Sequence, residues 1–166
     1  MAEQSRVSDQ LFLLSGIDDF QSFAQDLLGR SRRTIRILSN ELDPDIYGSL
    51  EFVDAISHFA RSSRYALVQI LVKDSKLVAG INHPLAKLHQ RLPSKIELRK
   101  LTQDPSDTNM AFLLGDSDLL LFKNDDRLLA GFCNWEAAVE AKPLIDEFER
   151  LWQFGELEPD LQVLHI

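Results

Sequence analysis

Apolar residues recur along this chain in two patterns, short runs typical of β-strands and longer segments with helical spacing. In the first hundred residues the two patterns alternate: strands are predicted at 10–14, 34–39, 66–72 and 96–100, and helices at 17–28, 50–60 and 83–91. Ser15 and Ser49 are placed to cap the first two helices, and Gly29 is placed to end the first. The continuous apolar run 66–72 is typical of a strand buried on both faces.

The remaining third has a different pattern, because short apolar runs follow one another without an intervening helix. Strands are predicted at 110–114, 118–123 and 127–133, with a hairpin turn at 124–126, and a further short strand is expected at 137–140. Pro143 fits the first position of a closing helix that ends near Phe154. These elements predict an α/β fold with a mixed β-sheet flanked by helices on both faces.

The length and composition fit one domain spanning 1–166, in which 1–8 are expected to be disordered and 157–166 form a C-terminal tail. The chain of 166 residues is 45% hydrophobic and 27% charged, and no apolar run approaches the roughly 20 residues that span a bilayer. The N-terminus lacks a signal-peptide layout. Cys133 is the single cysteine and has no intrachain partner, so a cytoplasmic location is expected.

The charge of the chain limits its partners. The formal net charge is −8, and a globally acidic chain repels polyanions, which argues against nucleic acid and against anionic membranes. A basic cluster of Arg30, Arg32, Arg33 and Arg36 is the exception. It is either a solvated helix end or, through Arg32 and Arg33, an anion-binding patch. The sequence contains no metal-ligand spacing, Gly-rich phosphate loop or dinucleotide motif, so no metal or cofactor is expected.

One pair of segments carries chemical information, Asn109 to Asp116 and the later Gly131-Phe132-Cys133-Asn134. In spacing and setting they resemble the phospholipase D superfamily signature, His-x-Lys-x4-Asp followed downstream by Gly-Ser-x-Asn. Asn109 stands at the His position and Ala111 at the Lys position, whereas Asp116, Gly131 and Asn134 match. The chain has 14 residues between Asp116 and Gly131, whereas the family usually has about six.

This resemblance covers most of the chain and implies one half of a phospholipase D-like protein. In active members one His attacks the phosphorus, a second His from the paired half protonates the leaving oxygen, and the Lys and Asn hold phosphoryl oxygens. An amide at Asn109 cannot form a phosphohistidine, and Ala111 supplies no donor. The resemblance therefore implies a non-catalytic member that forms a homodimer, and whose cleft either retains weak phosphate-ester binding through Asn109, Asp116 and Asn134 or is vestigial.

Several alternatives stay open from the sequence. The chain is a non-catalytic binding, assembly or regulatory domain, a divergent phosphodiesterase or nuclease using other residues, or a nucleic-acid-binding module using 30–36. Asp116 is either a site carboxylate or a turn residue, and Asn134 either lines a cleft or caps a turn. None of the four histidines, His58, His83, His89 and His165, shows a spacing that replaces the missing nucleophile. A partner protein is a further expectation for the acidic C-terminal part.

Overall fold

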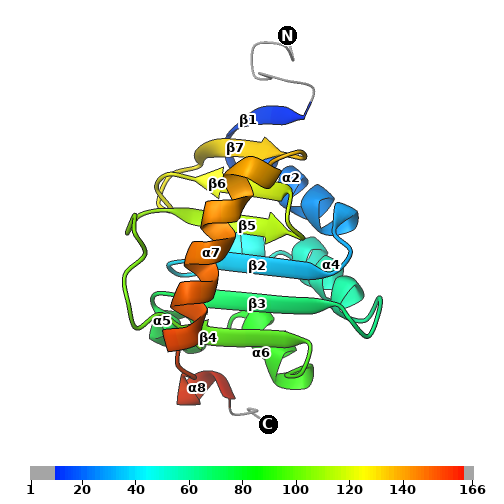
Figure 1. Cartoon of the computed structure of the whole chain (residues 1–166). Helices are drawn as coiled ribbons and strands as arrows, with labels where there is room; N and C mark the ends of the chain where they lie inside the picture. Colours follow the sequence, from blue (N-terminus) through cyan, green and yellow to red (C-terminus); the bar gives the residue numbers. More distant parts are fainter. Residues whose placement is uncertain (1–9, 163–166) are drawn as a thin grey trace.

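The sheet is mixed and carries helices on both faces, which confirms the predicted fold class (Figure 1). The structure, a computed structural model, describes residues 10–162, so the expectation for residues 1–8 lies outside the described residues. Seven strands follow the order β1-β7-β6-β5-β2-β3-β4. The strands are β1 (Leu11–Ser15), β2 (Thr34–Ser39), β3 (Leu67–Val72), β4 (Ile96–Lys100), β5 (Ala111–Gly115), β6 (Leu119–Lys123) and β7 (Ala130–Asn134).

The sheet has a parallel half and an antiparallel half that meet at β2. Strand β2 pairs with β3 in parallel and with β5 in antiparallel orientation, and β3 pairs with β4 in parallel. The remaining neighbours β5, β6, β7 and β1 are all antiparallel. All of the carboxyl ends of β2, β3 and β4 consequently lie at one edge of the sheet, together with the start of β5 and the end of β6.

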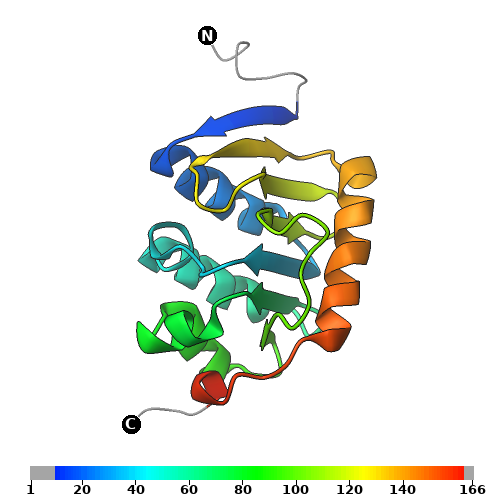
Figure 2. The same ribbon diagram turned by 90° about the vertical axis from the view of Figure 1, so that its left-hand side faces the viewer.

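Two apolar layers hold the helices on the sheet. The helices are α2 (Ile17–Arg30), α3 (Pro44–Tyr47), α4 (Leu50–Ala60), α5 (Ser75–Gly80), α6 (Pro84–Arg91), α7 (Ala138–Phe154) and α8 (Pro159–Gln162). One face is covered by α2, α4 and α6, where Phe20 and Phe52 are fully buried, and α7 crosses the other face (Figure 2). There Phe148 of α7 packs against Phe112 of β5, with ring centroids 6.3 Å apart.

The ends of α2 differ from those expected. Gly16 is the N-terminal cap residue, with φ 85°, a backbone conformation that glycine adopts without steric cost. Ser15 instead closes β1 and donates its N–H to the Asp19 carboxylate at 2.9 Å. Gly29 lies inside α2, and the helix ends one residue later, with Ser31 as the C-cap. The predictions for Ser15 and Gly29 were therefore wrong. Each rested on the preference of a residue type for a helix end, whereas the ends of α2 are formed by Gly16 and Ser31.

The closing helix begins earlier than expected. Residues 138–140 form the first turn of α7 and not a strand, so Pro143 lies in the helix interior. A proline there removes one hydrogen bond of the helix. Burial of Ala141, Phe148 and Leu151 against the sheet offsets this cost. The short helices α3, α5 and α8 were not anticipated, because four to six residues are too few to show a helical period.

Part of the expected C-terminal tail is packed on the domain. Glu156 forms a backbone bridge with Lys100 at the end of β4. Glu158 is buried, accepts a hydrogen bond from the Ser75 hydroxyl at 3.0 Å and lies 3.6 Å from the Lys100 ammonium. These contacts fasten α8 beside α5, so residues 156–162 help to build the carboxyl edge of the sheet.

We expect Gly29→Ala to raise the free energy of unfolding by about 0.5–1 kcal/mol, because alanine restricts the unfolded chain and favours the helix. A Cβ at Gly29 meets open space. Gly131→Ala is the contrasting variant, since an added Cβ would overlap the Phe122 carbonyl oxygen. It should lower stability by about 1–3 kcal/mol. Urea denaturation measures both, and a destabilised Gly29→Ala would contradict the helical assignment.

Candidate functional site

A polar network closes the sheet at the carboxyl end of β2. Asp126, in the turn after β6, accepts hydrogen bonds through its carboxylate from the Ser39 hydroxyl at 3.1 Å and the Asn40 N–H at 2.8 Å. Its own N–H donates to the Asn109 carbonyl at 2.9 Å. Asp126 thus joins the hairpin of the antiparallel half to the end of the central strand. In open α/β sheets this kind of edge is where ligands bind.

Lys123 lies beside Ala111 in the pairing of β5 and β6. Its ammonium is 2.7 Å from the Asp126 carbonyl, 3.6 Å from the Asp126 carboxylate and 5.4 Å from the centre of the Phe20 ring. The side chain is 2% exposed. Lys123 therefore occupies the neighbourhood of the family's lysine position but is committed to internal contacts, so its ammonium does not reach solvent.

The loop that follows β2 forms the rigid floor of this edge. The Ser39 hydroxyl also accepts the Leu42 N–H at 3.0 Å, and Leu42 has φ 55° and is fully buried. His83 donates from Nε2 to the Leu42 carbonyl at 2.8 Å while its Nδ1 accepts the Leu85 N–H at 3.1 Å. Burial lowers the pKa of His83. A neutral, fully bonded imidazole is a structural cap, not a nucleophile.

Two cavities flank the same loop. One, of about 490 Å³, is lined by Asn40, Glu41, Lys73, Asp74, Ser75, Lys76, Lys100 and Glu158. The other, of about 300 Å³, is lined by Asn40, Glu41, Asp43, Pro44, Asp126 and Arg127. Because Asn40 and Glu41 border both, the two cavities are neighbours, and together they are called here the carboxyl-edge cleft. The cleft is lined by both acidic and basic side chains. One of the basic groups, the Arg127 guanidinium, holds the pKa of Asp125 in the β6–β7 turn at about 2.

The three residues expected to form the site are not brought together. Asn109 is exposed and lies before β5, at the edge of the sheet that holds the carboxyl end of β2, but it lines neither cavity. Asp116 follows β5, and Asn134 ends β7 opposite Leu120, so both lie at the other edge of the sheet. The Asn134 side-chain oxygen accepts the Glu136 N–H at 2.8 Å. Asn134 therefore caps a turn within the chain.

The Asp116 carboxylate holds backbone N–H groups of a segment far away in the sequence. It has φ 53°, and its carboxylate accepts the N–H groups of Arg32, Arg33 and Thr34 at 2.8–3.2 Å. Its own N–H donates to the Thr34 carbonyl at 2.7 Å. These contacts match the alternative in which Asp116 is a turn residue.

The basic cluster divides into two kinds of arginine. Arg30 lies 4.4 Å from the centre of the Trp135 ring and 3.5 Å from Asp26. Arg36 lies 3.5 Å from Glu149, and burial lowers its pKa. Arg32 and Arg33 are exposed, and within residues 10–162 their guanidinium groups have no hydrogen bond or ion pair. Only these two match the anion patch expected from the sequence.

Asp126 is the residue that sequence reasoning missed. A signal was available: counting the family's usual gap of about six residues from Asp116 puts the Gly-Ser-x-Asn positions at Lys123, Asn124, Asp125 and Asp126. The pairing of β5 with β6 agrees with that alignment, since it places Lys123 beside Ala111. Gly131 and Asn134, which match the signature by residue type, lie one strand later, in β7.

The histidines, the cysteine and the acidic side chains of residues 10–162 are the remaining candidates for site chemistry. His89 is buried and bonds to the Ile96 carbonyl, and His58 is exposed on α4. His165 lies outside residues 10–162. Burial raises the pKa of the Cys133 thiol. Within that range no group of three or more His, Cys, Asp or Glu is arranged for a metal, and no helix has the length and apolar character to cross a bilayer.

Comparison with known families places the chain in one of them. The family described as "Domain of unknown function (DUF7931)" matches residues 16–164. The chain belongs to the DUF7931 family. No curated protein matches it in sequence.

Solved structures share the fold of this DUF7931 chain. Phosphatidylserine synthase of Haemophilus influenzae Rd KW20 is 10% identical, with a TM-score of 0.64, and the match covers 94% of this chain and 41% of that one. TrmBL2, an archaeal chromatin protein, is 14% identical, with a TM-score of 0.60 over 90% of this chain and 55% of that one. At such identity the likeness concerns the fold alone, and it supports the expected phospholipase D-like fold. The chain spans about half the length of these neighbours.

We expect Asp116→Ala to lower the free energy of unfolding by about 1–3 kcal/mol, because three backbone N–H groups at the start of β2 lose a charged acceptor. Asp116→Asn should cost much less, since an amide oxygen still accepts these bonds and asparagine tolerates a positive φ. Urea denaturation of both variants measures the difference. Equal, negligible losses would show that the carboxylate is not a backbone clamp.

Proposed function

We propose that this chain is a non-catalytic phospholipase D-like domain that acts through binding, in assembly or regulation. One observation carries the proposal: at the β5–β6 hairpin the chain has Asn109, Ala111 and Asp126 where the signature has His, Lys and Asn. None of them supplies a nucleophilic nitrogen or a positive charge to a phosphoryl group. A carboxylate at Asp126 repels a phosphodiester, so the substitution opposes the reaction as well as removing its parts.

The contacts of Asp126 support this proposal further. Its carboxylate is engaged by Ser39 and Asn40, and the nearby Lys123 ammonium is buried against Phe20. These groups stabilise the loop after β2 and leave the cleft to be formed by Asn40, Glu41 and Lys73. A rigid floor with mixed charges around it suits recognition of a polar ligand or a protein segment.

The competing proposal is a divergent phosphodiesterase or nuclease that uses other residues of the cleft. We expect no turnover of bis(p-nitrophenyl) phosphate above buffer at any pH tested, with or without divalent cations. Losing nucleophile and clamp costs several powers of ten in rate. Turnover by the wild type that disappears in Lys73→Ala, but persists in the distant Lys142→Ala, would establish the enzyme and end the non-catalytic proposal.

The proposal includes a homodimer. Active members of the superfamily that the chain resembles use two halves, and this chain supplies one. A symmetric pairing would place the same edge of both copies at the twofold axis. Light scattering at micromolar concentration should give twice the monomer mass, and a monomer would remove this part of the proposal.

Nucleic-acid binding is a second candidate function, favoured by the exposed guanidinium groups of Arg32 and Arg33, which have no hydrogen bond or ion pair in the described part of the chain. The fold is also found in TrmBL2, a chromatin protein whose structure shows DNA binding. If a nucleic-acid strand binds at the edge of the sheet where Arg32 and Arg33 lie, the affinity for a fluorescent oligonucleotide should fall steeply as the salt concentration rises. Arg32→Ala and Arg33→Ala should then weaken it to a similar extent, whereas Lys142→Ala should not. Salt-independent or absent binding would remove this candidate.

A further inference from the structure

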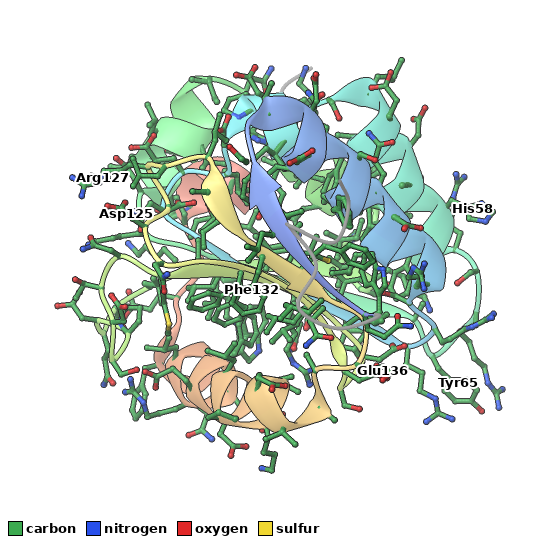
Figure 3. All side chains as sticks on the ribbon, turned by 90° about the horizontal axis from the view of Figure 1, so that it is seen from above. His58, Tyr65, Asp125, Arg127, Phe132 and Glu136 are labelled. Carbon is green, nitrogen blue, oxygen red and sulfur yellow. The ribbon has the colours of Figure 1, made fainter. Side chains whose placement is uncertain are left out.

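A separate cavity of about 470 Å³ lies at the opposite edge from the carboxyl-edge cleft, between the last turns of α2 and α4. Its volume lies in the range of small-molecule sites, roughly 300–1,000 Å³. Among its lining residues are Leu28, Gly29 and Arg32 from the end of α2 and its following turn, and His58 from α4. In Figure 3, His58 and Tyr65 lie on the side of the molecule opposite Asp125 and Arg127.

The walls of this cavity combine an apolar surface with unused polar groups. Leu28 and Phe59 are nearly fully buried and, with Ala55, form the apolar part. Gln25 and His58 are on α2 and α4, and their side chains, like that of Arg32, have no hydrogen bond within residues 10–162. Of the serine hydroxyls that line the cavity, Ser31 donates to the Leu27 carbonyl at 2.8 Å and Ser62 to the Phe59 carbonyl at 2.7 Å, whereas Ser63 accepts the Tyr65 N–H at 3.1 Å.

Asp116 presents Arg32 to this cavity. The carboxylate accepts the Arg32 N–H at 3.0 Å and the Arg33 N–H at 2.8 Å, which fixes the turn between α2 and β2. Because the carboxylate is bonded to backbone, it does not pair with the Arg32 guanidinium. The turn is therefore held by hydrogen bonds of its own, and within residues 10–162 the guanidinium has no hydrogen bond or ion pair, which lowers the cost of binding an anion.

The local charge favours an anion although the chain is acidic overall. Three basic residues lie at this edge of the sheet, where the parallel strands begin. Arg61 directly follows α4, Arg64 precedes β3 and Lys95 precedes β4. Lys95 is held there by the Ser63 carbonyl at 2.8 Å. Asp26, the acidic residue on the last turns of α2, already contacts Arg30. These basic side chains favour an anion near the cavity and are opposed on α4 by Asp54, four residues before His58.

We propose that this cavity binds a small phosphate monoester that carries a flat apolar group, of which a nucleoside monophosphate is an example. The donors of Gln25, Arg32 and His58 come from different elements, an arrangement that suits a tetrahedral anion better than a planar carboxylate. The planar guanidinium of Arg32 binds two phosphate oxygens at once. Leu28, Ala55 and Phe59 receive the apolar group. No group transfer is involved.

The chain offers a matched control for Arg32. Arg33 is the next residue, is exposed, and has its N–H held by the same carboxylate. Its side chain lines a different hollow, with Thr34, Arg36, Asp116, Ser117 and Ile145. Removing either guanidinium changes the net charge equally, but only Arg32 borders the cavity between α2 and α4.

The experiment is a titration of the full chain with adenosine monophosphate, followed by calorimetry and by amide NMR shifts. Saturable shifts are expected at Gly29, Arg32 and His58. Arg32→Ala should weaken binding by about tenfold or more, whereas Arg33→Ala should change it by less than about twofold. Ala55→Trp, which fills the cavity, should abolish binding while thermal unfolding shows that the variant is folded.

Several results would overturn the proposal. Equal losses of affinity in Arg32→Ala and Arg33→Ala would show a general attraction of anions to the basic edge of the sheet. That behaviour is expected of nucleic-acid binding and not of a specific cavity. If adenosine bound with the same affinity as adenosine monophosphate, the phosphate group would not be recognised. Shifts confined to Asn40, Asn109 and Asp126 would place the ligand in the carboxyl-edge cleft instead. Absence of saturable shifts would remove the site.

Discussion

The fold depends on how the central strand β2 is held at its two ends. Asp116 accepts the N–H groups at the start of β2, and Asp126 accepts the Ser39 hydroxyl and the Asn40 N–H at its end. Both carboxylates come from the antiparallel half of the sheet, whereas β2 also begins the parallel half. Two side chains therefore fasten the halves to each other at the strand where their orientation changes, in addition to the backbone ladder between β2 and β5.

These two fastenings also determine where binding can occur. At the carboxyl edge, Asp126 fixes a loop whose Asn40 and Glu41 face the cleft. At the amino edge, Asp116 fixes a turn that leaves the Arg32 guanidinium free. The same chemistry, a carboxylate bonded to backbone N–H groups, thus supports a cleft of mixed charge at one end and a cationic cavity at the other. Each cavity borders a segment that hydrogen bonds to a carboxylate hold in place.

The sequence predicted the regular elements better than the site. The bounds of β2, β4 and α4 follow directly from the apolar pattern, and the Ser49 hydroxyl caps α4 as expected by accepting the Phe52 N–H at 3.2 Å. The site required strand register, because residues that fall on opposite edges, such as Asn109 and Asp116, are only seven positions apart along the chain. A correct spacing count would have found Asp126, but its bonds to Ser39 and Asn40 depend on tertiary pairing.

The order in which the chain is synthesised gives the β2 fastenings a further consequence. The carboxylate of Asp116 binds an N–H group 84 residues earlier in the chain, and that of Asp126 binds one 86 residues earlier. While the ribosome is still making the second half, β2 can pair with β3, but its other edge has no neighbour. An open strand edge is a template for pairing with other chains. The nascent protein consequently passes through a stage at which its parallel half is complete and exposed to self-association, and the appearance of 111–126 ends that stage.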